Sequence, residues 1–148
     1  MEGLLKITKK NKNAIIPQRA TGGSAGLDLC ACIDAPVEIA PQQIVAVSTG
    51  IAIALPSENY VALVFARSGL GIKHGISLAN GVGVIDSDYR GEICVGLCNL
   101  SNEPYTIQPN ERIAQMVIMP TCPLALQEVD SLDLTARGEG GFGSTGRL

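Results

Sequence analysis

Short segments of β-forming residues recur along most of this chain, and proline stands in the gaps between them. The segments cover residues 37–39, 44–47, 51–55, 60–65, 93–100 and 113–119. The prolines in the gaps are Pro36, Pro41, Pro56, Pro104, Pro109 and Pro120. Proline sets the backbone of a turn without removing a hydrogen bond from a sheet. A series of short strands without a long helical period predicts an all-β sandwich or jelly roll.

Three further segments stand outside this series. Residues 68–74 are the one helical candidate, and the segment is short. Residues 4–7 are expected to form a first strand, and residues 123–134 keep enough alternation to form a last one. The whole chain has 148 residues, which suits one domain with a single core.

Composition narrows the classes of partner. Hydrophobic residues make up 46% of the chain, yet no apolar run approaches the roughly 20 residues of a membrane-spanning helix. The formal net charge of −3 gives no overall attraction to a polyanion. We therefore expect neither a membrane nor a nucleic acid as partner, whereas a small anion needs only local positive charge. The N-terminus lacks a charged and apolar leader, which predicts an intracellular protein, cytoplasmic or, in a eukaryote, nuclear or organellar.

Five cysteines occur, at positions 30, 32, 94, 98 and 122. Their spacing lacks the C-x2-C pairs of zinc sites. We interpret them as small buried hydrophobic side chains.

Asp28 interrupts the apolar run Leu-Asp-Leu-Cys-Ala at residues 27–31. Burying an unpaired carboxylate is costly, so Asp28 needs a partner.

Residues 80–92 place Asp86, Asp88, Tyr89 and Arg90 within five positions. Strand-forming residues lie on both sides, which predicts a hairpin with this polar cluster at its head. Binding and catalytic groups are often mounted on such loops. The alternative is a solvated hairpin whose acids only keep the turn polar.

The last twelve residues, 137–148, are rich in glycine. Gly138, Gly140 and Gly143 have the spacing of a dinucleotide-binding motif, but no helix can follow, so a Rossmann fold is rejected. A phosphate-binding P-loop would need lysine where Ser144 stands. Two interpretations remain: a disordered tail, or a segment whose amides wrap a phosphate chain while Phe142 stacks on a nucleobase.

Four arginines stand at expected strand ends beside small or polar residues: Arg67, Arg90, Arg112 and Arg137. Arg67 is followed by Ser68 and Gly69 at the start of the expected helix, where free amides favour an anion. Each arginine alone is readily explained as a surface or ion-pair residue. Together with the tail they indicate a polyphosphate site.

With these segments in view, the chain resembles the homotrimeric deoxyuridine triphosphatase (dUTPase) family. Five motifs match in order, at residues 25–31, 66–70, 80–92, 112–115 and 137–146. The resemblance implies a distorted jelly-roll subunit in a threefold homotrimer, with active sites shared between chains. It further implies a domain at residues 1–136 and a C-terminal arm at residues 137–148 that closes the site. The activity implied is hydrolysis of dUTP to dUMP and pyrophosphate with Mg²⁺, which supplies the precursor of dTMP and keeps uracil out of DNA.

The resemblance also implies roles for individual residues. Asp86 would be the general base that activates water, with Gln115 near that water. Asn80 and the backbone of Gly83 and Val84 would pair with the uracil edge, and Tyr89 would lie under the deoxyribose and exclude a 2′-hydroxyl.

Other matched residues would bind the phosphates and the metal. Arg67, Ser68 and Gly69 would hold the phosphates, and Asp28 would act through water in the second shell of Mg²⁺. Within the arm, Phe142 would stack on uracil, and the residues near the phosphates would be Arg137, Gly143, Ser144 and Thr145.

Two departures from the family pattern lie beside functional residues. Ala66 replaces the usual proline before Arg67, and Asn110 replaces the usual glycine before the acid-arginine pair. Arg90 and Glu92 are expected to form structural ion pairs.

Two alternative functions remain open. The related dCTP deaminases share the fold but need a glutamate against the base, and a nucleotide sensor would keep the fold without catalysis.

Overall fold

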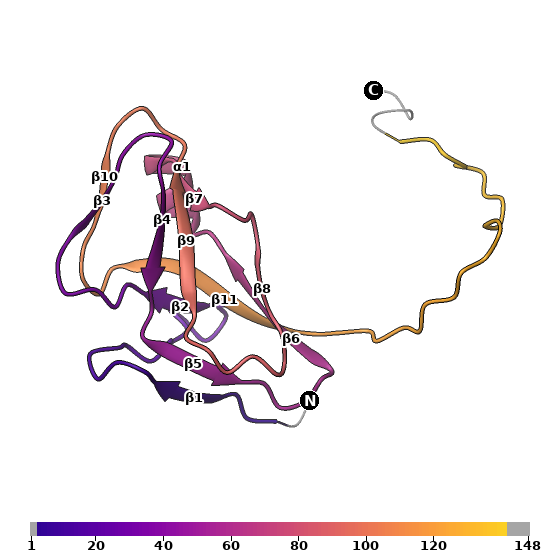
Figure 1. Cartoon of the computed structure of the whole chain (residues 1–148), viewed down its shortest axis with the longest axis horizontal. Coiled ribbons are helices and arrows are strands. Elements are labelled where there is room, and N and C mark those ends of the chain that lie inside the picture. Colours follow the sequence, from indigo (N-terminus) through magenta and orange to yellow (C-terminus); the bar gives the residue numbers. More distant parts are fainter. Residues whose placement is uncertain (1–2, 142–148) are drawn as a thin grey trace.

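The computed structural model describes residues 3–141 and contains one short helix and eleven strands (Figure 1). In chain order the elements are β1 (Lys6–Lys9), β2 (Leu27–Cys30), β3 (Val37–Ile39), β4 (Ile44–Ser48), β5 (Ile51–Ala54), β6 (Tyr60–Phe65), α1 (Ser68–His74), β7 (Ile76–Leu78), β8 (Gly83–Ile85), β9 (Cys94–Asn99), β10 (Tyr105–Ile107) and β11 (Arg112–Pro120). The prediction of an all-β jelly roll with one short helix is confirmed.

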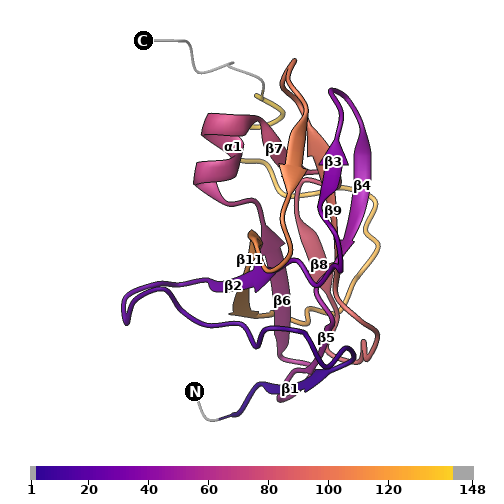
Figure 2. The same cartoon turned by 90° about the vertical axis from the view of Figure 1, so that its left-hand side faces the viewer.

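Two antiparallel sheets form the body of the molecule. One has the strand order β2-β11-β6-β8 and the other the order β4-β9-β7, while β1 with β5 and β3 with β10 form smaller pairs. Figure 2 shows β4 and β9 on one side of the body and β2, β11 and β6 on the other. In a strand, successive side chains point to opposite faces of the sheet. Each sheet therefore turns alternate residues inward.

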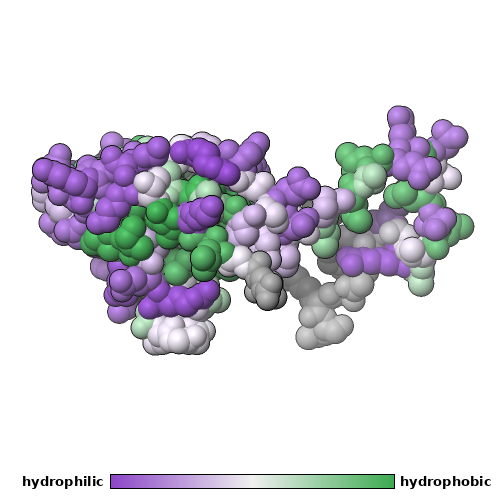
Figure 3. Space-filling model, turned by 90° about the horizontal axis from the view of Figure 1, so that it is seen from below, coloured by the Kyte–Doolittle hydropathy of each residue, from purple (hydrophilic) through white to green (hydrophobic). Residues whose placement is uncertain are grey.

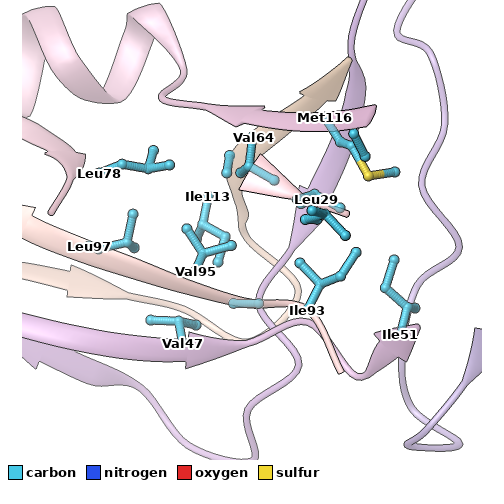
Figure 4. Packing of buried hydrophobic residues seen from close by; sticks show 14 of the residues in the cluster. Leu29, Val47, Ile51, Val64, Leu78, Ile93, Val95, Leu97, Ile113 and Met116 are labelled. Atoms are coloured by element: carbon cyan, nitrogen blue, oxygen red, sulfur yellow. The ribbon is translucent and has the colours of Figure 1, made fainter. Parts of the chain in front are cut away.

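The core lies between these inward faces. Val47, Leu78, Val95 and Leu97 of the three-stranded sheet meet Leu29, Val64, Ile113 and Met116 of the four-stranded sheet (Figure 4). All eight are at most 5% exposed. Aliphatic side chains fill this core, as expected from a chain with only five aromatic residues. Among residues 3–141 no helix is long and apolar enough to cross a membrane.

The helix has the predicted limits, and glycine ends it. Gly75 follows α1 with φ 68°, and its N–H donates to the carbonyl of Gly71. Side chains are strained at such positive φ values, whereas glycine adopts them freely.

The predicted hairpin around residues 80–92 is wrong in its pairing. β8 pairs with β6, with Leu63 opposite Val84, and β9 pairs with β4 and β7. Residues 86–93 thus pass from the edge of one sheet to the middle strand of the other. Strand propensity reports which residues extend but not which strands meet.

Other strand predictions need smaller corrections. β7 and β10, of three residues each, were not anticipated. The first strand begins at Lys6 rather than residue 4. Residues 123–134 form no strand within the described chain, and they run away from the body (Figure 1).

The cysteines are not buried as predicted. Cys30, Cys32 and Cys98 are partly exposed, and Cys94 and Cys122 are exposed. Cys94 and Cys98 occupy the outward positions of β9, while Val95 and Leu97 take the inward ones. Burial nevertheless raises the pKa of the Cys30, Cys32 and Cys94 thiols, with smaller contributions from nearby carboxylates. The raised pKa disfavours the thiolate, which is the reactive form of cysteine, at neutral pH.

A hydrogen-bonded turn connects β10 to β11. The Glu111 carboxylate accepts the Tyr105 hydroxyl at 2.6 Å and the Gln108 N–H at 2.8 Å. The Tyr105 ring also packs against His74 at the end of α1, with ring centroids 4.8 Å apart. Asn110 lies in this turn with φ 66°, which explains the departure from glycine, because asparagine tolerates this conformation better than most residues.

We expect Tyr105→Phe to change the response of stability to alkaline pH. Burial, and then the hydrogen bond to Glu111, raise the pKa of Tyr105 from 10.0 to about 12. Because the folded-state pKa is raised, the Tyr105 contribution is present below pH 10 and is lost as pH rises from 10 to 12. Denaturant unfolding at intervals from pH 8 to 12 should show a smaller loss in the variant over that range. Removing the hydrogen bond should also lower stability at pH 8 by about 1 kcal/mol. Equal pH dependence in the two proteins would contradict the assignment.

Candidate active site

Residues from the end of β8 and the following loop line a cavity of about 230 Å³, here called the loop cavity. It contains five of the residues predicted for the base, the sugar and water activation: Asn80, Gly83, Val84, Asp86 and Tyr89. Val64, Leu78 and Val95 make one wall apolar. The side chain of Asp86 is exposed, directly after the buried Ile85. A cavity with an apolar wall and a few polar groups suits a flat heterocycle.

Tyr89 is held within its own loop. Its hydroxyl donates to the Glu92 carbonyl at 2.9 Å, and its N–H donates to the Asp86 carbonyl at 3.2 Å. Gly91 lies under the phenol, and a side chain there would collide with Tyr89. Tyr89 is 46% exposed and lines the loop cavity.

The predicted ion pairs of Arg90 and Glu92 do not form within residues 3–141. Arg90 Nη1 instead donates to the carbonyls of Ser87 and Tyr89, at 2.7 and 2.8 Å. Glu92 Oε1 accepts the Gly50 N–H at 2.8 Å and the Ser48 hydroxyl. Both residues stabilise local structure, but neutral backbone and hydroxyl groups satisfy them rather than opposite charges.

A second cavity of about 370 Å³ lies on the four-stranded sheet, here called the arginine cavity. It brings together the predicted residues Asp28, Arg67, Ser68, Gly69 and Gln115. It also contains Arg112.

Asp28 is shared between two arginines. Its Oδ1 lies 3.2 Å from Arg67 Nε, and its Oδ2 lies 3.1 Å from Arg112 Nη1. Arg67 Nη1 also donates to the Arg112 carbonyl at 3.0 Å. These contacts supply the partner that an acid in an apolar strand requires. Two cations around one carboxylate leave a positive balance, which suits an anionic ligand.

Gln115 is oriented by its neighbours. Its Nε2 donates to the Ala66 carbonyl at 3.0 Å, and Phe65 and Asp28 lie opposite it on the two adjacent strands. A Cβ on Gly26 would lie 2.7 Å from Gln115 Oε1, so a side chain there would displace the Gln115 amide. The residues of three motifs are thereby packed against one another.

Sequence reasoning named Arg112 among four arginines but gave it no individual role at the site. Residues three apart on a regular strand point to opposite faces, so a regular strand would not bring Arg112 and Gln115 to one cavity. The register of β11 against β2 shifts between Arg112 and Ala114. Such a bulge brings both side chains to one cavity, and no sequence pattern predicts the bulge.

The remaining predicted residues belong to the arm. Arg137 is exposed, and its Nε donates to the Gly140 carbonyl at 2.8 Å. Phe142, Gly143, Ser144 and Thr145 lie outside the described residues.

No group of three or more acidic, histidine or cysteine side chains that could hold a metal occurs among residues 3–141. Asp28 is the one acidic residue among the described residues that line the arginine cavity. A single carboxylate beside a phosphate site fits contact with a hydrated Mg²⁺ through water, since this ion keeps several of its waters. The role of Asp28 toward the metal stays a prediction.

Comparisons with known proteins agree with this arrangement. A model of the dUTPase family matches residues 12–146. The deoxyuridine 5′-triphosphate nucleotidohydrolase of Desulfitobacterium hafniense is 54% identical over 138 residues, covering 93% of this chain and 91% of that protein. The enzyme of that name from Neisseria meningitidis serogroup A is 51% identical over 142 residues, covering 96% and 95%.

Solved structures show the same fold. The dUTPase of Staphylococcus bacteriophage 80alpha, a mutant with dUpNHpp, aligns with a TM-score of 0.87 and 28% identity, covering 97% of this chain and 98% of that one. A dUTPase mutant of S. aureus phage phi11, described with a structural Mg(II) ion, aligns with a TM-score of 0.78 and 24% identity, covering 88% and 99%. From the family match and the coverage of its relatives, this chain belongs to the dUTPase family.

Proposed function

We propose that the protein hydrolyses dUTP to dUMP and pyrophosphate. The observation that carries this proposal is the pairing of two cavities on one fold. One has an apolar wall and an exposed carboxylate, and the other gathers Arg67, Arg112 and Gln115. A nucleotide combines a neutral base with a charged phosphate chain, so its binding site needs both kinds of cavity. Similar proteins are named for this reaction, and one was solved with dUpNHpp, an analogue of dUTP. Such an activity would supply the precursor of dTMP and keep uracil out of DNA.

The loop cavity would recognise deoxyuridine. Asn80 and the backbone of Gly83 and Val84 would pair with the uracil edge, and cytosine would place its donors against donors. Tyr89, fixed above Gly91, would lie under the deoxyribose and leave no space for a 2′-hydroxyl.

Asp86 would supply the chemistry. Its carboxylate would take a proton from water as the water oxygen bonds to the α-phosphorus. The bond from the α-phosphorus to the bridging oxygen breaks, and pyrophosphate leaves with the electron pair. Gln115 would orient the water, and Arg67, Ser68, Gly69 and Arg112 would hold the phosphates. Asp28 would contact Mg²⁺ through water, and the bound ion would neutralise phosphate charge.

A homotrimer would bring the two cavities together. The outward face of the four-stranded sheet carries apolar side chains: Val61, Leu63, Phe65, Val84, Val117 and Met119. Leu63 stands opposite both Val84 and Val117, and Val84 is 64% exposed. A contiguous apolar face of this kind marks a contact surface. The arginine cavity lies at one end of this face. β8 is an edge strand of the same sheet, and its residues line the loop cavity. Contact between copies would therefore complete each site from neighbouring subunits.

The C-terminal residues would close the site. The segment after β11 leaves the body, and its apolar side chains are exposed (Figure 3). Leu124 is 82% exposed, and Leu126 and Leu134 are fully exposed at 100%. An exposed apolar segment that does not pack on the rest of its own subunit is suited to packing on another subunit. On this proposal residues 1–136 form the domain, and residues 137–148 form an arm whose Arg137, Phe142, Gly143, Ser144 and Thr145 cover the nucleotide.

Asp86→Asn should lower turnover by several orders of magnitude while nucleotide binding and fold remain. Loss of a general base lowers the rate by about 10²- to 10⁴-fold. Pyrophosphate release from dUTP, dCTP and UTP with Mg²⁺ measures the reaction, and calorimetric titration with dUpNHpp measures binding. Asp88→Asn, an exposed acid two positions away, is the matched control and should retain activity. Near-normal turnover in the Asp86 variant would remove that residue from the base role, and ammonia release from dCTP would indicate a deaminase.

The trimer can be tested through the outward face. Light scattering should give three times the subunit mass of 15.4 kDa. Leu63→Lys should lower the mass toward that of the monomer and reduce activity, because a charge would lie in the contact. Ile72→Lys is the control, since Ile72 is 88% exposed and lies on α1 rather than on the four-stranded sheet. A monomeric wild-type protein with full activity would contradict the shared site.

Deleting residues 137–148 should leave a folded trimer with little dUTP hydrolysis. Circular dichroism and light scattering report the fold and the mass, and pyrophosphate release reports activity. Loss of folding would show that the arm is structural rather than a lid.

A further inference from the structure

The loop that follows Asp86 is fastened to the corner between β4 and β5 by hydrogen bonds that the proposed reaction does not use. The Thr49 hydroxyl and N–H both donate to the Ile93 carbonyl, at 2.6 and 3.2 Å. The Ile93 N–H donates to the Ile51 carbonyl at 2.9 Å. One residue earlier, Glu92 Oε1 accepts the Gly50 N–H at 2.8 Å and the Ser48 hydroxyl.

This corner is a rigid anchor. Gly50 has φ 67°, and a Cβ there would lie 2.7 Å from Cys32 Sγ and 2.8 Å from the Ala14 side chain. The Gly50 carbonyl also accepts the N–H groups of Lys10 and Asn11, at 2.7 and 3.1 Å. Gly50 is thus held on both sides, and the Glu92 carboxylate is attached to a part of the fold that cannot easily move.

Glu92 in turn holds Tyr89. The Tyr89 hydroxyl donates to the Glu92 carbonyl at 2.9 Å, and the ring is 46% exposed. The core therefore does little to fix the ring. Glu92 lines the loop cavity together with Tyr89 and Asp86, so a shift of its backbone would change the shape of that cavity.

We propose that Glu92 is a positioning residue that sets the height of the Tyr89 ring and thereby enforces rejection of the ribose 2′-hydroxyl. The inference rests on the proposed hydrolysis of dUTP and adds a specificity determinant that acts through Tyr89. When Glu92 loses its contacts with Gly50 and Ser48, its carbonyl shifts and the phenol follows. The added space then admits the 2′-hydroxyl of a ribonucleotide. A change of about 1 Å in placement alters rates by up to about 10²-fold, so the effect should be measurable.

The test compares kcat/KM for dUTP and UTP in the full-length protein. Glu92→Leu removes the acceptor and should lower the preference for dUTP over UTP by about tenfold or more. Glu92→Gln keeps an oxygen for the Gly50 N–H and the Ser48 hydroxyl, and should stay within about threefold of the wild type. Glu38→Leu, the same replacement at an exposed acid of β3, is the control and should leave the preference unchanged.

A double-mutant cycle shows whether Glu92 acts through Tyr89. Tyr89→Phe removes only the hydroxyl that binds the Glu92 carbonyl, so it should lower the preference. The Glu92→Leu/Tyr89→Phe variant should lose little more than the stronger single variant, because both changes break one connection. Fully additive losses would overturn the proposal.

Other outcomes are also decisive. A lower melting temperature with equal losses of kcat/KM for dUTP and UTP would show a merely structural role for Glu92 and overturn the inference. If Glu92→Leu does not fold, Ser48→Ala, which removes one donor to the same oxygen, takes its place, and an unchanged preference there overturns the inference. A wild-type protein that does not hydrolyse dUTP would overturn the proposed function itself, and this is seen before any variant is compared.

Discussion

The pairing of β11 with two neighbours organises both the core and the candidate site. β2 lies along one edge of β11 and β6 along the other, and the register sets Gln115 between Asp28 and Phe65. Inward residues of the same strands, such as Leu29, Val64 and Met116, fill the core. One set of backbone hydrogen bonds therefore holds the hydrophobic interior together and brings residues of three distant motifs to one cavity. A shift of one position would turn the site residues inward and expose the core.

Electrostatic balance lets two arginines stand close together in the arginine cavity. Asp28 separates Arg67 from Arg112, so the two guanidinium groups do not face each other unscreened. A phosphate chain could add to this arrangement, because each arginine keeps donors that Asp28 does not use. The acid that looked out of place in an apolar strand thus organises the cationic side of the site.

Several surfaces of the single chain are incomplete by themselves. The outward face of the four-stranded sheet is apolar, and the segment after β11 exposes leucines that pack on nothing in the body. The two cavities divide the proposed binding residues between them rather than forming one pocket. The proposed trimer with shared sites would account for all three features together, and the proposed role of Glu92 would keep the loop cavity in shape.

Sequence alone determined the elements whose cause is local. Helix α1 matched its prediction because glycine stops it, and most of the longer strands were visible from β-forming residues between prolines. The ordered motifs identified Asp86, Tyr89, Arg67 and Gln115 as candidate site residues, and the fold assembled them into two cavities.

Tertiary structure alone decided the relations between distant segments. It paired β8 with β6 instead of β9, turned Arg112 into the site through a bulge, and gave Asp28 two arginine partners. It also joined Glu92 to Gly50 and Ser48 rather than to a cation. Each of these depends on register and on groups far apart in the chain. Local propensity and side-chain period carry no information about such partners, because they describe only how a segment extends and which of its faces is apolar.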